Sequence, residues 1–567
     1  MLFYCYSEIG DSTIESRLGD ADYSYYFVLK AYVPLLEKLG SVHIAHVVDD
    51  DLIAHCRAQQ DAGQTCVLLA FAPPHKVTFE LPCPVVPVFP WEYSSIPTRE
   101  SVKDASADWC LSPQALSQAI THSAYAKAVL QHELGEDFNV ESIPAPVWDL
   151  YSGLRSSATS RLPVKEASIA LGTAIIDSRD FTIASESIAP ASKVARPLGG
   201  SAANAACGDI TIDFGEHNPD VWLVGFYPPE PWGAWSRTNS PWIMLPSVVS
   251  GPISLKVSLN GYGGNVGREI QMRIGEECVT VIPQLEMSEF EFELDIQQPS
   301  NFITFSGLDA AAHRHIVDPR TIGIGLANIT IRSKADAAGQ AVSELEAMEQ
   351  SLDIKGVVYT SVLNPRDSRK NWEDILTAFC IAFHDREDAT LILKMTYKDM
   401  SGYMEDIFSL FCQLHPFKCR VIVIHGYIST QEYTDLIAAT TYVVNASRSE
   451  GQCLPLMEYM SSGIPAIAPD NTAMADYIRA DNTFVVASSP EPHYWPHDPQ
   501  QMFTTLWYRP SWESLYKAFQ ESYEVAVNDT QKYIGMSRCA WESQYEYCSS
   551  DTLLPRLDSL LHRIVNQ

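Results

Sequence analysis

The sequence predicts an α/β protein made of two doubly wound domains with an all-β sandwich inserted between them. Strand-sized apolar runs alternate with helical segments in residues 1–150 and again after residue 354. Short alternating runs without helical periodicity fill residues 206–334, as in antiparallel sheets. A chain of 567 residues is also too long for one hydrophobic core, so we expect three or four domains.

Composition and charge exclude several classes of function. Hydrophobic residues make up 46% of the chain and charged residues 19%, and no apolar run reaches the length of a transmembrane segment. The net charge of −31 argues against binding of nucleic acid and against broad adhesion to anionic lipid. The thirteen cysteines are scattered without a Cys-x-x-Cys pair, which suits a reducing compartment. We therefore expect a cytoplasmic protein.

Residues 1–150 are predicted to form the first doubly wound domain. The apolar segment at the N-terminus is interpreted as a first strand and not as a signal peptide, because it has no basic leader. Residues Tyr25–Leu36 carry apolar side chains at helical spacing between the first two strands. The candidate strands of this parallel sheet are Leu2–Tyr6, Val42–Val47, Thr65–Phe71 and Val85–Phe89.

The middle of the chain has a different character. Residues 151–205 are rich in Ser, Ala, Thr, Pro and Gly and are predicted to be a linker or irregular surface. Residues 206–334 contain runs such as Ile253–Leu259 and Phe290–Leu294, which predict a β-sandwich of about eight strands. Two tryptophans in this insertion, Trp232 and Trp235, are either buried sandwich aromatics or a platform for a sugar ring, so a carbohydrate-binding module is one interpretation.

The second doubly wound domain is predicted at residues 354–567. A Glu- and Ala-rich connecting helix, roughly Ala341–Leu352 within residues 335–353, leads into it. Apolar residues from Trp372 to Phe383 recur at helical intervals, and the tail from about residue 511 is helical in pattern. The candidate strands are Val357–Thr360, Thr390–Lys394, Arg420–Ile424, Thr441–Asn445 and Ala466–Ala468.

The segment Ser449–Pro465 carries the most specific chemical signal. A loop follows the strand that ends near Asn445, and Pro455 suits the first turn of the next helix. Two carboxylates, Glu450 and Glu458, lie eight residues apart, one in the loop and one in the helix. Free backbone amides at the helix start would bind a phosphate or a sugar oxygen. Together these groups could hold a nucleotide sugar at several points.

This segment resembles the Glu-x7-Glu motif of family-four retaining glycosyltransferases, which have the GT-B fold of two Rossmann-like domains. The chain departs from the usual Phe-Gly at Gln452 and Cys453, and from two alanines at Tyr459 and Ser461. In the family the first acid contacts the transferred sugar and the second contacts the ribose. The resemblance therefore implies these roles for Glu450 and Glu458, with donor contacts at Gln452, Cys453 and Leu454. The matching residues are Glu450, Gly451, Leu454, Pro455, Glu458, Met460, Gly463 and Pro465.

A cation cluster at an earlier strand-to-helix turn fits the same family. Arg366, Arg369 and Lys370 follow the strand Val357–Thr360, at the kind of turn where α/β folds bind anions. In the family this turn supplies an Arg and a Lys that hold the donor diphosphate, and Lys370 matches the lysine. The usual Arg position holds Asn364, so either Arg366 or Arg369 could supply the second charge. A solvated helix cap is the structural alternative.

Two further segments are candidates for substrate contacts. By the resemblance, the loop His425–Ile428 lies against the nucleobase and Tyr427 is a donor-binding residue, whereas His425 could equally be a packed histidine at a strand end. Trp91 and Glu92 follow a predicted strand in a segment rich in groups that bind sugars. We interpret them as acceptor-binding residues, with packing and helix capping as the alternative.

No convincing metal site is present in the sequence. The run Asp49–Asp51 follows a strand and precedes a helix, so helix capping explains it. His313 and His315 could share one face of a strand, but no further ligands accompany them. A phosphate-binding P-loop and a Gly-x-Ser-x-Gly elbow are also absent from the sequence.

The resemblance implies a retaining, metal-independent hexosyltransferase without a cofactor. Its donor would be a nucleotide-diphosphate sugar and its acceptor a glycan or lipid-linked glycan, as in bacterial surface polysaccharide biosynthesis. A GT-B glycoside phosphorylase remains an alternative, and so does a non-catalytic carbohydrate-binding or scaffold protein. The expected location is the cytoplasm, with transient peripheral association with the inner membrane left open.

Overall fold

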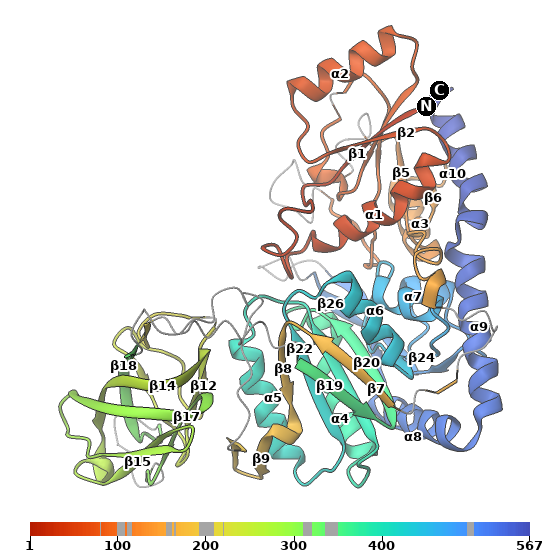
Figure 1. Ribbon diagram of the computed structural model, residues 1–567. Helices are drawn as coiled ribbons and strands as arrows, with labels where there is room; N and C mark the ends of the chain where they lie inside the picture. Colours follow the sequence, from red (N-terminus) through yellow and green to blue (C-terminus); the bar gives the residue numbers. More distant parts are fainter. Residues whose placement is uncertain are drawn as a thin grey trace. The chain divides into compact units, whose positions relative to one another are not determined.

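The computed structural model describes residues 1–79, 81–98, 108–109, 116–154, 162–163, 166–191, 209–218, 220–309, 320–334, 350–495 and 504–566 (Figure 1). They form two compact units. The first comprises Met1–Ala167, Lys355–Ala382 and Thr434–Gln567, and the second comprises Ser168–Ile354 and Phe383–Tyr433. Each unit therefore combines segments that are far apart in the sequence.

The N-terminal part of the first unit is a parallel sheet with the strand order β2-β1-β3-β4. It confirms the four predicted strands, with bounds that agree to within two residues. Helix α1 (Tyr23–Glu37) confirms the helix expected at Tyr25–Leu36. The side chain of Asp49 accepts a hydrogen bond from the Leu52 amide at 2.9 Å and so caps α2 (Asp50–Asp61), as expected. The strands are β1 (Leu2–Tyr6), β2 (Ser41–Ala45), β3 (Cys66–Ala70) and β4 (Val85–Pro87).

A smaller parallel pair completes this part. Strands β5 (Gln118–Thr121) and β6 (Asn139–Ser142) flank helix α3 (Ala124–Leu134). The side chain of Ser123 caps α3 by accepting a hydrogen bond from the Ala126 amide at 3.1 Å. The start of α3 is thereby fixed.

The C-terminal part of the first unit contains a second parallel sheet, in the order β25-β24-β23-β20. Helix α4 (Trp372–Ala382) buries the apolar stripe that the sequence predicts. Strands β26 (Ser488–Tyr494) and β27 (Thr504–Pro510) pair antiparallel as a separate two-stranded ribbon. The remaining elements are β20 (Val357–Leu363), β23 (Tyr442–Val444), β24 (Ala466–Ala468), β25 (Thr483–Val485), α7 (Leu454–Ser461), α8 (Trp512–Asn528), α9 (Thr530–Cys548) and α10 (Ser550–Val565).

The C-terminal helices join the two parts of the first unit. The Tyr547 hydroxyl, near the end of α9, donates a hydrogen bond to the His122 carbonyl at 2.6 Å. Arg556 of α10 donates to the Ser142 carbonyl at the end of β6. The long helices α9 and α10 run along one side of this unit (Figure 1), so the N-terminal and C-terminal sheets share one scaffold.

Residues 166–190, within the segment 151–205 that was predicted to be a linker or irregular surface, form four short strands instead. Strand β8 (Ala174–Asp177) pairs antiparallel with β22 (Arg420–His425), which pairs parallel with β21 (Ala389–Met395). Strand β8 could not be recognised in the sequence, because four residues are too few to show an alternating pattern of apolar and polar residues. A buried ion pair fixes it: the Arg420 Nε donates to the Asp177 carboxylate at 3.0 Å. The other elements are β7 (Glu166–Leu171), β9 (Phe181–Ala184), β10 (Ser187–Pro190), β19 (Gln350–Lys355), α5 (Ser401–Leu414) and α6 (Thr430–Ala439).

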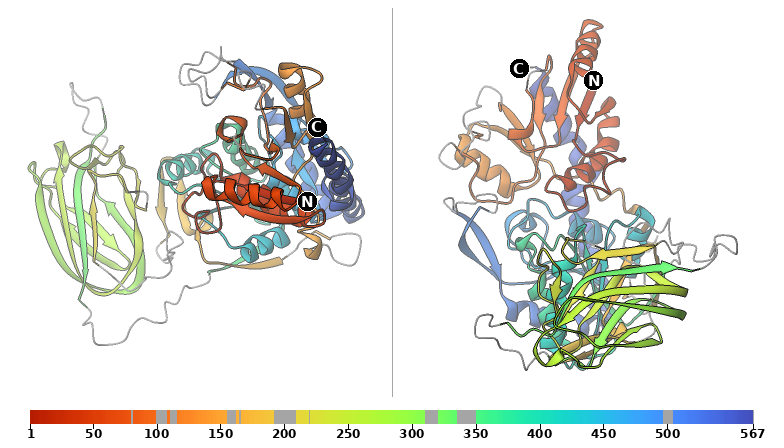
Figure 2. Two further views of the ribbon diagram at one scale, coloured as in Figure 1. Left: turned by 90° about the horizontal axis from the view of Figure 1, so that it is seen from above. Right: turned by 90° about the vertical axis from the view of Figure 1, so that its left-hand side faces the viewer.

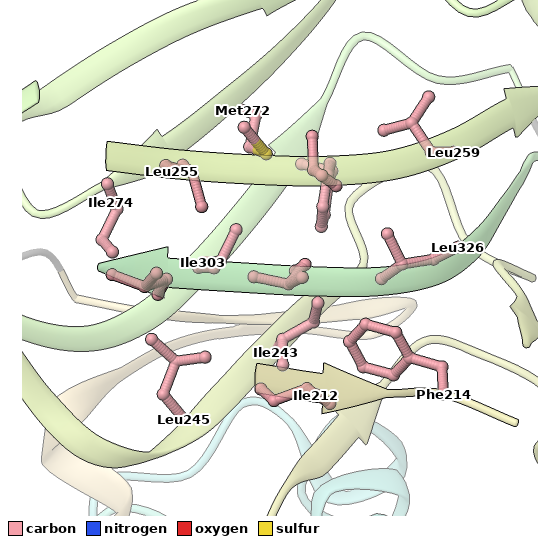
Figure 3. Packing of buried hydrophobic residues seen from close by; sticks show 14 of the residues in the cluster. Ile212, Phe214, Ile243, Leu245, Leu255, Leu259, Met272, Ile274, Ile303 and Leu326 are labelled. Carbon is pink, nitrogen blue, oxygen red and sulfur yellow. The ribbon is translucent and has the colours of Figure 1, made fainter. Parts of the chain in front are cut away.

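An antiparallel β domain occupies the predicted insertion. Its strands follow the order β11-β18-β14-β17-β15-β16, with β12 beside β14 and β13 beside β18, and the long strands run next to one another (Figure 2). Aliphatic side chains such as Leu255, Ile303 and Leu326 form its core (Figure 3). The all-β character is therefore as predicted. The strands are β11 (Ile210–Asp213), β12 (Trp222–Val224), β13 (Ala234–Trp235), β14 (Trp242–Gly261), β15 (Ile270–Ile274), β16 (Glu277–Val281), β17 (Ser288–Ser306) and β18 (Ile324–Ser333).

The connecting helix expected at residues 335–353 is wrong at its C-terminal end. Residues 350–353 belong to strand β19, which pairs with β7, because Leu352 and Ile354 alternate with polar residues and both are buried. The rest of that helix lies outside the described residues, as do His313 and His315. No helix in the described ranges is both long and apolar enough to cross a membrane.

Candidate functional site

The turn after β20 is held in shape by its own side chains. The Asn364 carboxamide accepts a hydrogen bond from the Arg366 amide at 3.0 Å and donates to the Gly19 carbonyl at 2.9 Å. Asn371 closes the turn with a left-handed backbone conformation, φ 53°, which asparagine adopts more readily than most residues. The residue that stands in place of the family arginine therefore has a structural role here. Arg366 itself is exposed.

Arg369 is held by two carboxylates. Its guanidinium donates to both oxygens of Asp367, at 3.0 and 2.6 Å, and also pairs with Glu92. Burial tends to lower the pKa of Arg369, but the neighbouring Glu92 charge and Asp367 raise it well above its ordinary value. The charge of Arg369 is thus already compensated within the protein.

Lys370 forms a second ion pair with the loop before α7. Its ammonium donates to Glu450 Oε1 at 2.7 Å, and the side chains are 20% and 5% exposed. Burial raises the pKa of the Glu450 carboxyl, but the Lys370 and Arg369 charges outweigh this effect and lower it overall. Burial likewise opposes the charged form of Lys370, yet the Glu450 carboxylate raises its pKa above the ordinary value. Both groups therefore remain charged at neutral pH.

The start of α7 presents backbone amides beside Glu450. Cys453 adopts a left-handed conformation, φ 65°, at the N-cap position, and Pro455 lies in the first turn as predicted. The carboxamide of Asn445 donates to Glu450 Oε1 at 3.4 Å and to Cys453 Sγ at 3.2 Å. Gln452 is 3% exposed, and within the described residues neither polar atom of its side chain has a hydrogen-bond partner. A buried amide in this state points to a ligand.

The second acid of the motif lies apart from this pair. Glu458 is half-buried on α7, and the Tyr151 phenol contacts it. Burial raises the pKa of Tyr151, and the charge of Glu458 and a hydrogen bond to it raise it further. The two acids thus have different partners, Lys370 for Glu450 and Tyr151 for Glu458.

The segment predicted to bind the acceptor packs against the motif loop. A Cβ atom on Gly451 would lie 2.6 Å from the Pro90 Cβ and 3.0 Å from the Trp91 amide nitrogen, so only glycine fits there. The Trp91 indole donates to the Ser95 carbonyl at 2.9 Å and contacts the Trp495 ring, with centroids 5.6 Å apart. Trp91 is therefore a packing residue in this structure, and Glu92 pairs with Arg369.

The loop expected to lie against the nucleobase belongs to the second unit. His425 is buried beside the Trp222 ring, with centroids 5.5 Å apart, and burial lowers its pKa to about 4, with the Lys394 charge acting in the same direction. Lys394 is 3% exposed and donates to the Gly426 carbonyl at 2.7 Å, and burial lowers its pKa to about 7. Tyr427 follows, half-buried. His425 thus has the environment of a packed histidine.

Sequence reasoning missed Arg448. Its amide donates to the Arg369 carbonyl at 2.8 Å, and its guanidinium donates to Asn371 Oδ1 at 3.4 Å and lies over the Trp507 ring, 5.6 Å from the centroid. Within the described residues no carboxylate forms a salt bridge with it. Its only sequence signal was a cation two residues before Glu450, which is too common to single out.

No cluster of three or more His, Cys, Asp or Glu side chains that could hold a metal ion occurs in the described parts of the chain.

In the β domain, Trp232 and Trp235 contact each other edge to face with centroids 4.9 Å apart, and Trp232 is 36% exposed. This pair is therefore partly at the surface.

The segment that contains Lys370 and Glu450 matches a known family. Residues 355–494 match the family described as "Glycosyl transferases group 1". This segment is a glycosyltransferase group 1 domain. Residues 216–333 match a domain of unknown function, DUF7024. No curated protein matches the chain.

Solved structures match at low identity. HepE from Anabaena, solved with UDP and glucose, is 14% identical over 37% of this chain and 48% of that protein, with a TM-score of 0.27. The pneumococcal O-GlcNAc transferase GtfA, solved with UDP and GlcNAc, is 13% identical over 37% and 36%, with a TM-score of 0.27. The C-terminal domain of LpcC from Francisella tularensis is 15% identical over 34% and 84%, with a TM-score of 0.25. The chain spans about half or less of the first structures that it matches.

Proposed function

We propose that this protein is a retaining glycosyltransferase that moves a hexose from a nucleotide-diphosphate sugar to a glycan or lipid-linked glycan. The observation that supports this most directly is the buried Lys370–Glu450 pair, at 2.7 Å, within the glycosyltransferase group 1 domain. In this proposal Lys370 is the cation for the leaving diphosphate and Glu450 is the acid beside the transferred sugar. Bacterial surface polysaccharide synthesis in the cytoplasm is the setting we propose.

The donor diphosphate would bind at Lys370 and the start of α7. An ammonium group has three N–H donors, and the bond to Glu450 uses one of them. The others can reach phosphate oxygens together with the backbone amides near Cys453 and Leu454. The carboxamide of Gln452 can hydrogen-bond to the donor as well.

We propose Arg448 as the second cation of the diphosphate site. Arg369 is compensated by Asp367 and Glu92, and these two carboxylates would repel a diphosphate that approached it. Arg448 lies at the same turn through Asn371. Its guanidinium can therefore bind phosphate without breaking an ion pair.

These groups define the chemistry that we propose. As the sugar–phosphate bond breaks, negative charge grows on the diphosphate, and Lys370, Arg448 and the α7 amides stabilise it as it forms. The sugar becomes cation-like, and the Glu450 carboxylate lies next to it. The acceptor hydroxyl attacks from the face that the diphosphate leaves, which retains the anomeric configuration, and the phosphate accepts its proton. Because side chains and amides compensate the charge, we propose that no divalent cation is required.

Donor hydrolysis tests this proposal without knowledge of the acceptor. The protein is incubated with UDP-, GDP- and ADP-hexoses, and release of the nucleoside diphosphate is measured, with the anomer of the freed sugar determined by NMR. We expect one nucleotide to be released, with retained configuration, and Lys370→Ala to abolish release while the protein stays folded. Inversion would contradict the retaining mechanism. Release that needs added inorganic phosphate would indicate a phosphorylase.

A further inference from the structure

A cavity of about 450 Å³ adjoins the motif loop in the first unit. Its wall combines Tyr125 at the start of α3, Thr472 and Asp476 after β24, Ser488 on β26 and Tyr508 on β27. This volume lies within the range of small-ligand sites and would hold one or two sugar rings. Tyr125 and Tyr508 lie outside the residues that match the glycosyltransferase family.

Hydrogen bonds connect this cavity directly to Glu450. The Glu450 amide donates to Thr472 Oγ1 at 2.9 Å, and the Ala473 amide donates to the Glu450 carbonyl at 3.2 Å. The Tyr508 amide donates to the Arg448 carbonyl at 2.8 Å. The loop that would contact the transferred sugar is thus hydrogen-bonded to two of the residues that line the cavity, Thr472 and Tyr508.

The lining has the chemistry of a polyol site. Four of the lining residues carry a hydroxyl group, Tyr125, Thr472, Ser488 and Tyr508, and the rings of the two tyrosines have flat apolar faces. The Thr472 hydroxyl already bonds to Asn471 and to the Glu450 amide. The hydroxyl of Tyr125 is buried and has no hydrogen-bond partner within the described residues. A buried hydroxyl without a partner is costly, and a small movement of the Tyr125 ring toward the cavity would let a sugar supply the missing hydrogen bond.

The charge of the lining limits which sugar fits. Asp470 and Asp476 contribute carboxylates, and none of the described residues that line the cavity is a cation. A phosphate or a uronate would therefore meet repulsion, and the donor diphosphate has its cations elsewhere, at Lys370 and Arg448. A neutral sugar meets no such penalty, and an amino sugar is attracted.

We infer that this cavity binds the acceptor and selects a neutral or amino-bearing glycosyl unit. The inference rests on the proposed glycosyltransferase function, because it takes Glu450 as the acid beside the transferred sugar. Tyr125 and Tyr508 are binding residues for the acceptor and take no part in holding the donor.

Ligand-detected NMR with simple glycosides tests this assignment. Binding of methyl glucoside, methyl glucosaminide, methyl glucuronide and glucose 6-phosphate is measured on the full chain with its nucleoside diphosphate present. Donor hydrolysis is measured on separate samples of the same protein, with the nucleotide sugar in place of the nucleoside diphosphate. We expect the first two glycosides to bind and the two acidic sugars to bind at least tenfold more weakly.

Three tyrosine substitutions locate the binding. Tyr125→Phe removes only the hydroxyl and should weaken glycoside binding about threefold to tenfold without lowering the melting temperature. Tyr508→Ala, whose backbone contact persists, should abolish it. Tyr494→Phe is the matched control: Tyr494 lies on β26, is 45% exposed and does not line the cavity. Donor hydrolysis should stay within twofold of the unmodified protein in Tyr494→Phe.

The outcomes separate the two proposals. Glycoside binding that is absent, that prefers the acidic sugars, or that survives both cavity variants overturns the acceptor assignment, while donor hydrolysis continues. Absence of hydrolysis with every nucleotide sugar overturns the proposed function itself. Glycoside binding lost in the cavity variants and kept in Tyr494→Phe, with donor hydrolysis present in the unmodified protein and in Tyr494→Phe, supports both.

Discussion

Replacement of Lys370 should lower the stability of the protein, because it breaks the ion pair between Lys370 and Glu450. Lys370→Met keeps most of the side-chain volume but leaves Glu450 as a buried carboxylate, 4% exposed. The charge of Arg369 and the 3.4 Å bond from Asn445 remain as its compensation. Breaking a buried pair from one side typically costs about 3–5 kcal/mol. Because Lys370 is 20% exposed, we expect a loss of about 3 kcal/mol.

The double variant Lys370→Met with Glu450→Gln separates stability from function. With no stranded charge left, it should recover most of the lost stability and lie within about 1 kcal/mol of the unmodified protein. Its affinity for the nucleoside diphosphate should stay low, because the cation is still missing. Urea unfolding gives the free energies and calorimetry gives the affinities.

The pH dependence gives an independent check. In the unmodified protein the pKa of Glu450 is lowered, so its contribution to stability is present at neutral pH and is lost as the pH falls through the folded-state pKa. In Lys370→Met the cation that opposes the effect of burial is gone, so the folded-state pKa of Glu450 rises. As the pH falls, Glu450 of the folded variant is therefore protonated at a higher pH than Glu450 of the unmodified protein. The stability gap should therefore narrow from pH 7 to pH 5. A single variant as stable as the unmodified protein at pH 7, or a double variant with restored diphosphate affinity, would refute this reasoning.

Four further outcomes are expected. Arg448→Gln should weaken nucleoside diphosphate binding about tenfold by calorimetry, whereas Arg366→Gln, at an exposed position, should have little effect; equal effects would reject the assignment. Glu458→Gln should lower diphosphate affinity more than turnover, and Glu450→Gln should do the reverse; proportional losses in both would show that the acids do not have separate roles. The pKa of Lys394 is lowered to about 7 in the folded protein, so between pH 7 and 10 the unfolded chain binds this proton more strongly than the folded one. The free energy of unfolding, measured with urea, should therefore rise over that range. Lys394→Met should remove this dependence on pH. Activity should persist in excess EDTA, and a loss restored by manganese would contradict metal independence.

Local patterns in the sequence anticipated the elements near the site well. Ala466–Ala468 is the strand that the sequence predicts, and Arg420–Ile424 differs from β22 by one residue. Strands of this type are continuous apolar runs because both faces of the sheet are buried. The start of α7 was also legible, since Pro455 and Gly463 mark the ends of the helix.

Contacts between distant residues could not be predicted in the same way. Glu92 and Arg369 are 277 residues apart, and nothing in the local pattern of either indicates the other. Expecting Arg369 at the diphosphate was reasonable from its charge alone, but its compensation by Asp367 and Glu92 depends on tertiary structure. Within the described residues no carboxylate pairs with Arg448, and this too depends on tertiary structure. Charge at a turn predicts an anion site, whereas the identity of the cation depends on which carboxylates fold against it.

The antiparallel strand β8 has a consequence for synthesis of the chain. Asp177 and Arg420, which fix β8 on β22, are 243 residues apart. At about 5–20 residues per second, a ribosome needs roughly 10–50 seconds to make the intervening chain. Through that interval β8 has no partner strand, and its two isoleucines, which are buried in the finished protein, are exposed. An unpaired strand of this kind can add to other strands, so slower translation after β8 should increase aggregation of the nascent chain, and Ile175→Thr should reduce it.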